Sequence, residues 1–253
     1  MLEHSNKTAI NAAWSFFKGN YALNFAAIAI LIVLNLLGMI PVIGMLFIFA
    51  YSIVSLAVQI YFGRAVAKVN DPQDLADIAA QTKIGDLLTT YLQTAAGAFL
   101  GFFLIFLLFS FLFGIAISMS IDVEQLQNGM MSQAQMITMM SSGGAVGLLL
   151  LVIAAFFFYF APGVLGEIIK TDDFTEAFKK SFWIFSPSFW KRCFNKEYFV
   201  LIFIWSLILI GVGIVMVLMA SSIILLPVVL VIAYIVSLYN AAIYVFAADL
   251  AKE

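Results

Sequence analysis

The sequence has very little charge: only 10% of its 253 residues are Asp, Glu, Lys or Arg. A soluble domain carries roughly 25% charged and roughly 45–50% apolar residues. Here 64% of the residues are hydrophobic. This composition excludes an ordinary soluble protein and indicates an integral membrane protein, because the bilayer solvates the apolar surface of such a chain.

Cysteine and histidine are nearly absent. The one cysteine, Cys193, excludes a disulfide within the chain and a cysteine cluster for zinc or iron–sulfur, and the one histidine is His4. The sequence contains no phosphate-binding glycine loop, metalloprotease motif or catalytic triad pattern. It therefore predicts no enzyme activity, no cofactor and no metal site. We expect the neighbouring Arg192 to lower the pKa of the Cys193 thiol.

Long intervals without charge predict the membrane-spanning helices. A spanning helix needs about 20 mostly apolar residues. Such stretches lie near residues 21–38, 42–62, 95–118, 145–165, 198–219 and 223–247. The predicted fold is all-α and polytopic, with six transmembrane helices arranged as three hairpins in a single membrane domain, 1–253. Pro162 is expected to kink the fourth helix or to end its regular hydrogen bonding.

The basic residues predict the orientation of the chain. With six spans, all twelve Lys and Arg residues fall on the side that holds both termini. The other side receives only Asp122 and Glu124. Because basic residues are enriched in cytoplasmic loops, we expect both termini to be cytoplasmic.

Amphipathic segments precede the odd-numbered spans, near residues 8–17, 72–92 and 175–185. Trp14 and Phe17 share a face of the first segment, and Phe178 and Phe182 share a face of the third. We expect each segment to be a cytoplasmic helix lying on the membrane surface. Together with the hairpins they suggest a threefold repeat, 5–70, 71–172 and 173–253. The alternative is that membrane interfaces favour aromatic residues anyway.

The segment from residue 174 to 205 carries basic residues next to aromatic ones, directly before an uncharged run. Cations and aromatic rings both favour the headgroup level of a bilayer. The candidates for contact with phospholipid headgroups are Lys179, Lys180, Lys191, Arg192, Lys196, Trp183 and Trp190. We do not expect nucleic acid as a partner, because the aromatic neighbours already have a role at the membrane.

Few polar residues lie within the spans, and no ionisable residue lies in the middle of one. This weakens the case for ion-coupled transport. Asn35, Gln59 and Asn240 are the candidates for a polar intramembrane site, with packing hydrogen bonds between helices as the alternative. A cavity that reaches the bilayer midplane and is lined by Asn35 or by Ser52, Ser55, Ser206 or Ser237 would favour transport. A dry, tightly packed interior would favour a scaffold.

Two further clusters have plain explanations. Six methionines lie between residues 118 and 144, and thioethers suit Cu(I), but an amphipathic helix on the outer surface explains their spacing without metal. Four acidic residues follow the fourth span and could bind a hard cation or perform acid–base chemistry. They are mixed with lysines, so we expect a solvated cytoplasmic face for Glu167, Asp172, Asp173 and Glu176.

Two stretches resemble a known type of protein: AINAAWSFFKGNYALNFAAIAILIVLN and FTEAFKKSFWIFSPSFWKRCFNKEYFVLIF. They resemble bacterial six-span proteins of the YciC-like type, and they are similar to the membrane domain of some glycerophosphodiester phosphodiesterases. The resemblance implies a bacterial inner-membrane protein with no assigned activity. The sequence has no soluble phosphodiesterase domain, so that catalytic function does not carry over.

These patterns favour a non-enzymatic protein of the bacterial inner (cytoplasmic) membrane. The first hypothesis is a scaffold or regulator that contacts the phospholipid bilayer or another membrane protein. The alternative is a transporter or channel for a lipid-like or weakly polar small molecule.

Overall fold

All regular structure in the described part of the chain is helical. The computed structural model describes the backbone of residues 2–120 and 133–251, and the side chains of these residues except 113–120, 133–146, 150 and 223. The all-α prediction is confirmed.

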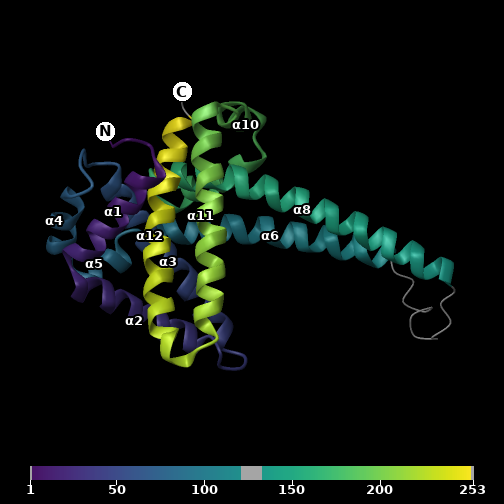
Figure 1. The fold of residues 1–253 in the computed structure, drawn as a ribbon, viewed down its shortest axis with the longest axis horizontal. Coiled ribbons are helices and arrows are strands. Elements are labelled where there is room, and N and C mark those ends of the chain that lie inside the picture. Colours follow the sequence, from purple (N-terminus) through teal and green to yellow (C-terminus); the bar gives the residue numbers. More distant parts are fainter. Residues whose placement is uncertain (1, 121–132, 252–253) are drawn as a thin grey trace.

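Six long helices form three hairpins (Figure 1). The pairs are α2 (Tyr21–Leu37) with α3 (Gly44–Val66), α6 (Leu92–Ser120) with α8 (Gln133–Ile169), and α11 (Lys196–Ala220) with α12 (Leu226–Leu250). Five helical stretches among the described residues are long and apolar enough to cross a membrane. A sixth is added if α2 and the preceding helix, which meet at a bend of 98°, count as one span. The chain is a multi-pass membrane protein. Helix α8 continues seven residues beyond Pro162 and does not end there.

Short helices precede each hairpin. They are α1 (Asn6–Gly19) before the first, α4 (Asp74–Gln81) and α5 (Ile84–Thr89) before the second, and α9 (Phe174–Ser181), the 3-10 helix η1 (Phe182–Phe185) and α10 (Pro187–Cys193) before the third. The single helix expected over 72–92 is wrong, because the backbone is extended at Thr82 (ψ 131°). The Thr82 hydroxyl hydrogen-bonds the carbonyl of Ile78 (2.7 Å) and the hydroxyl of Tyr61 (3.0 Å). Such side-chain bonds compete with helix continuation.

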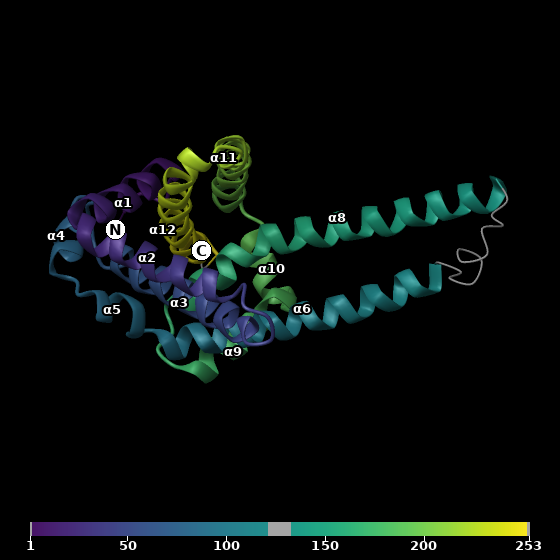
Figure 2. The same cartoon turned by 90° about the horizontal axis from the view of Figure 1, so that it is seen from below.

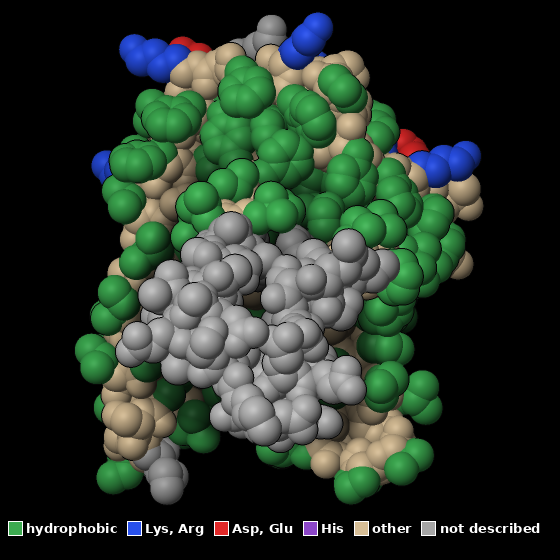
Figure 3. Space-filling model, turned by 90° about the vertical axis from the view of Figure 1, so that its right-hand side faces the viewer, with side chains coloured by type: hydrophobic (Ala, Val, Ile, Leu, Met, Phe, Trp, Pro, Cys, Tyr) green, Lys and Arg blue, Asp and Glu red, His purple; other side chains and the backbone are tan. Residues whose placement is uncertain are grey.

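The hairpins point in different directions. In Figure 1 α11 and α12 stand upright while α6 and α8 run across them and project to one side, and Figure 2 shows the same crossing with α11 and α12 seen nearly end-on. Side chains on the described part of the face in Figure 3 are mostly hydrophobic, with Lys and Arg gathered in its upper half. The six long helices therefore radiate from a shared base and do not form one parallel bundle.

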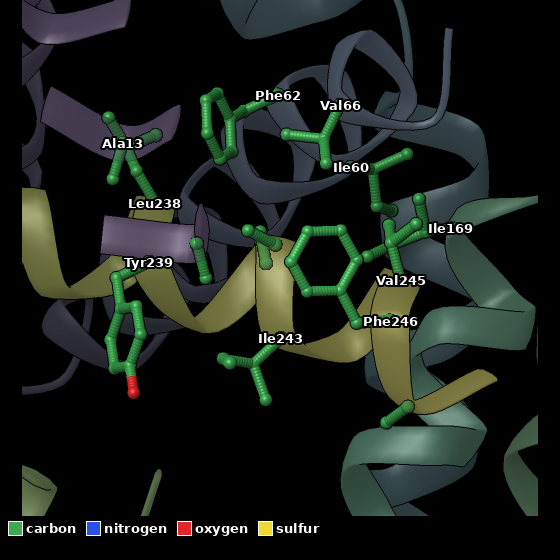
Figure 4. Close-up of a cluster of buried hydrophobic side chains, with 14 of the residues drawn as sticks. Ala13, Ile60, Phe62, Val66, Ile169, Leu238, Tyr239, Ile243, Val245 and Phe246 are labelled. Carbon is green, nitrogen blue, oxygen red and sulfur yellow. The ribbon is translucent and has the colours of Figure 1, made fainter. Parts of the chain in front are cut away.

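The shared base is built on α12, which packs against α8, α3, α1 and α11. Helices α8 and α12 meet at Gly166, where an added Cβ would overlap the carbonyl oxygen of Tyr244 and would lie 2.6 Å from the Cβ of Ala248. Small residues allow such close approach of two helices in a membrane. Helices α3, α8 and α12 also share a cluster of buried side chains (Figure 4), which includes Phe62, Val66, Ile169, Leu238, Ile243, Val245 and Phe246.

The short helices before the first and third hairpins bury only part of the apolar face expected for each. In α9, Ala177 and Ser181 are buried against α6, where a Cβ added at Gly101 would lie 2.5 Å from the Cβ of Ser181. The bulkier Phe182 is exposed. In α1, Ala13 and Phe17 are buried while Trp14 is 45% exposed. Each apolar face expected from helical spacing is therefore buried along one edge and exposed along the other. Spacing alone does not show which edge of the face the protein covers.

Candidate functional site

A cavity of about 380 Å³ lies between α2, α3 and α12. Its wall combines apolar side chains with five polar ones. The lining residues are Ile28, Leu31, Ile32, Asn35, Leu36, Tyr51, Ser55, Leu226, Leu230, Ala233, Tyr234 and Ser237. This wall contains no Asp, Glu, Lys, Arg or His, so it offers an uncharged surface with hydrogen-bonding groups.

The cavity extends far along its helices. Ser55 lies eleven residues after the start of α3, and Ser237 lies eleven residues after the start of α12. At 1.5 Å per residue this is about 16 Å from those helix ends. The hydrocarbon core of a bilayer is about 30 Å thick. A cavity of this length reaches the region of the bilayer midplane if α3 and α12 cross the membrane upright.

Three polar side chains in the cavity wall lack a protein partner. Within the described part of the chain, the amide of Asn35, the phenol of Tyr51 and the hydroxyl of Ser55 make no side-chain hydrogen bond to protein. By contrast, the hydroxyl of Ser237 donates to the carbonyl of Tyr234 (2.7 Å). Unpaired polar groups are costly in a hydrocarbon environment. The three groups are therefore suited to water or to the polar part of a bound molecule.

One end of the cavity is closed by packed side chains. The Tyr234 hydroxyl donates to the Oδ1 of Asn24 (2.9 Å), and the ring of Tyr234 lies 6.4 Å from that of Phe17. Leu238, one turn further along α12, is fully buried. At the other end Leu36 is 57% exposed and Leu226 is 45% exposed. The cavity is thus open toward the uncharged ends of the helices and closed toward the charged ends.

The resemblance to YciC-like proteins rests on sequence pattern alone. A comparison with protein-family models, with curated proteins and with solved structures finds no match for this chain.

The structure places the three predicted intramembrane residues in different surroundings. Asn35 lines the cavity, whereas Gln59 and Asn240 are not in its wall. The Oδ1 of Asn240 accepts a hydrogen bond from the indole N–H of Trp205 (2.8 Å), which ties α12 to α11. Tyr51 was missed by the sequence analysis. Its spacing of four residues from Ser55 places both on one helix face and could have indicated it.

The residues predicted to contact headgroups surround α9, η1 and α10. Lys179, Lys191, Arg192 and Lys196 are exposed. Trp183 and Trp190 are half-buried. The Trp183 ring lies 5.4 Å from the Lys180 ammonium and 5.8 Å from the Arg192 guanidinium. The Trp190 indole N–H donates to the carbonyl of Ile184 (2.7 Å). The segment from residue 179 to 196 thus holds four exposed cations and a tryptophan ring that lies close to two cations. Its contact with lipid headgroups stays a prediction.

The solvated face expected for Glu167 is wrong. Glu167 is only 8% exposed, and its carboxylate lies 3.6 Å from each of the ammonium groups of Lys170 and Lys180. Lys170 also pairs with Asp249 (2.8 Å) and Lys180 with Glu176 (3.2 Å). Glu167 is buried because the adjacent glycine contact brings α8 against α12. These ion pairs join α8, α9 and α12.

The other acidic residues of that cluster, Asp172, Asp173 and Glu176, are exposed as expected. Asp172 is exposed and pairs with Arg64. The carboxylate of Asp173 accepts a hydrogen bond from the backbone N–H of Glu176 (2.8 Å) and caps the start of α9. No group of three His, Cys, Asp or Glu side chains that could hold a metal ion is found in the ranges with described positions. The methionines considered for copper lie outside the described side chains.

Burial controls the chemistry of Cys193. The side chain is fully buried, and this desolvation raises the pKa of the thiol to about 11. A hydrogen bond with Tyr198 and the charge of Arg192 both lower it, but by less. Arg192 therefore lowers the pKa of the thiol as expected, but burial outweighs this effect and the thiol is not activated.

A second hollow, of about 910 Å³, lies between α1 and α4. Trp14 and Lys18 of α1 face Asp74 and Asp77 of α4 across it. The two helices approach closely at Gly19, where an added Cβ would lie 2.5 Å from the Cα of Ala76. This α1–α4 groove is polar and charged, in contrast to the cavity.

Proposed function

We propose that this protein binds an uncharged, weakly polar, lipid-like molecule inside the membrane and acts as a transporter or channel for it. The observation that supports this most is the set of unpartnered groups of Asn35, Tyr51 and Ser55 in the wall of one open cavity. The hydrocarbon region of a membrane offers no hydrogen-bond partners, so a bound molecule with polar groups can supply the missing partners of these side chains.

The chemical class follows from the wall. A charged molecule would enter a low-dielectric cavity without a counter-charge, which is unfavourable. Apolar residues supply most of the wall, and a few polar groups can fix orientation, as is usual in ligand sites. The volume lies toward the lower end of the usual range, about 300–1,000 Å³. A small amphiphile with hydroxyl or amide groups matches this wall.

A scaffold or regulator is the second candidate. The ion pairs around Glu167 and the buried cluster of Figure 4 form a dense base that joins all three hairpins. Such a base, with exposed cations on α9 and α10, could hold anionic lipid or another membrane protein. This candidate does not explain the cavity.

We further propose the bacterial inner membrane as the location, with both termini cytoplasmic. The support is the one-sided distribution of Lys and Arg along the sequence, together with the resemblance to YciC-like proteins. In this orientation the closed end of the cavity faces the cytoplasm.

Binding of a neutral probe tests the proposal. We would measure equilibrium binding of radiolabelled monooleoylglycerol to the protein in lipid nanodiscs. Ser55→Leu fills the cavity and removes one hydroxyl from its wall. Ser52→Leu is the matched control, because Ser52 does not line the cavity and donates to its own helix at Ile48 (2.9 Å). We expect saturable binding by the parent and by S52L, and binding at least about tenfold weaker in S55L. The proposal fails if the parent binds no more than empty nanodiscs, or if S55L binds like S52L.

A further inference from the structure

One buried amide touches both the cavity wall and the first helix. Asn24 has no exposed surface. Its Nδ2 group lies within hydrogen-bond distance of the carbonyl oxygens of Phe16 (3.3 Å), Phe17 (3.2 Å) and Asn20 (2.8 Å). Its Oδ1 accepts the hydrogen bond from the Tyr234 hydroxyl. Both ends of the Asn24 side chain are therefore in use.

These carbonyls belong to the end of α1 and to its junction with α2. The last carbonyls of a helix have no partner within that helix. Asn24 supplies one from the next helix, across the sharp bend at which α1 ends and α2 begins. The position of α1 relative to α2 therefore depends on the orientation of the Asn24 amide.

Tyr234 is the only residue of the cavity wall that hydrogen-bonds to Asn24 among the contacts described. We infer that Tyr234 and Asn24 couple occupancy of the cavity to the position of α1, an inference that rests on the proposed function. A molecule that fills the cavity presses on the Tyr234 ring, or accepts the hydrogen bond that the Tyr234 hydroxyl otherwise donates to Asn24. Either event weakens the bond to Asn24, and in a dry core the freed Oδ1 has no water to replace it. The amide then reorients, and the end of α1 loosens.

The loosened end of α1 is a wall of the α1–α4 groove. Lys18 and Gly19 lie in the last turn of α1 and line that groove opposite Asp74 and Asp77. A change at Asn24 therefore alters the charged surface at the far side of the protein from the open end of the cavity. The coupling connects a site at membrane depth to a site in water.

A second tyrosine–asparagine pair provides a matched control. The Tyr239 hydroxyl donates to the Oδ1 of Asn6, and the Nδ2 of Asn6 donates to the carbonyl of Leu201 (3.1 Å). This pair also ties α12 to α1, but at the start of α1, and Tyr239 does not line the cavity. Tyr239→Phe therefore removes a comparable bond without touching the coupling.

Hydrogen exchange of backbone amides tests the coupling. We would compare residues 16–24 in the parent, Tyr234→Phe and Tyr239→Phe, in nanodiscs with and without monooleoylglycerol. Loss of one hydrogen bond should raise local exchange about fivefold. We expect the probe to cause this rise in the parent and in Y239F. Y234F should show it without the probe and should not respond further.

Binding of the probe is measured in the same nanodiscs, so two failures can be told apart. If the probe binds and exchange in the parent does not change, or if Y234F responds as the parent does, the coupling is refuted and the proposed function stands. If the probe does not bind, the proposed function is refuted, and the coupling with it. If Y234F exchanges rapidly throughout, including in α8, the variant is not folded and Ala233→Leu is used in its place. The leucine side chain of A233L fills part of the cavity without a probe. Unchanged exchange at 16–24 in folded A233L refutes the coupling.

Discussion

The contact between α8 and α12 at Gly166 allows a sharp test of the packing. In Gly166→Ala the new Cβ would overlap the carbonyl oxygen of Tyr244 and would lie 2.6 Å from the Cβ of Ala248. Neither atom belongs to the end of a flexible side chain, so the two helices have to move apart. Overpacking of this kind costs about 1–3 kcal/mol. The same movement lengthens the ion pair between Lys170 and Asp249, which spans these helices.

Gly211→Ala is the control for this substitution. Gly211 also lies inside a membrane helix, α11, but a Cβ there meets nothing within 4 Å. Alanine is the better helix former by about 0.5–1 kcal/mol. We would measure unfolding of both variants by titration of detergent-solubilised protein with sodium dodecyl sulfate. G166A should lose about 1–3 kcal/mol while G211A loses none. Equal stability of G166A and the parent would show that the α8–α12 contact is not formed as described.

Three further predictions concern topology, charge and the thiol. Reporter fusions at position 130 and at the C-terminus should lie on opposite sides of the membrane, and the six-span topology is refuted if they lie on the same side. Replacing Lys191, Arg192 and Lys196 by Gln should remove at most about 3 kcal/mol of attraction to anionic lipid. Protease access to residues 174–189 in inside-out vesicles should then rise. Equal cleavage of parent and variant at every lipid composition would exclude a lipid role for these cations. The thiol of Cys193 should react slowly with a maleimide at pH 8, and faster only as the pH rises toward its pKa of about 11. The unfolded protein should react at once. Rapid labelling of the folded protein at pH 8 would contradict the burial of this side chain.

The long helices could be predicted from sequence, because length and hydropathy decide which segments cross a bilayer. Their contacts could not. Gly166 stands in the sequence as one glycine among sixteen, and only the approach of α12 gives it a role. Glu167 was expected in water for the same reason, since a single sequence does not show which helix covers which face.

The cavity was predictable in part. Asn35, Ser55 and Ser237 are polar residues in apolar runs, and they stand out in the sequence. Tyr51 and Tyr234 did not, because tyrosine in a membrane protein usually indicates the interface. Their grouping depends on α12 packing beside the first hairpin, which lies almost two hundred residues earlier in the chain.

The order in which the ribosome makes the chain gives these long-range contacts a consequence for biosynthesis. Asn24 and Asn6 enter the membrane region early, but their tyrosine partners follow 210 and 233 residues later, both on α12. Until that last helix is inserted, two asparagine side chains lack the hydrogen-bond donors that they have in the finished protein. A chain that stops before α12 therefore leaves the Oδ1 atoms of Asn24 and Asn6 without these donors, and the insertion of a single helix supplies both.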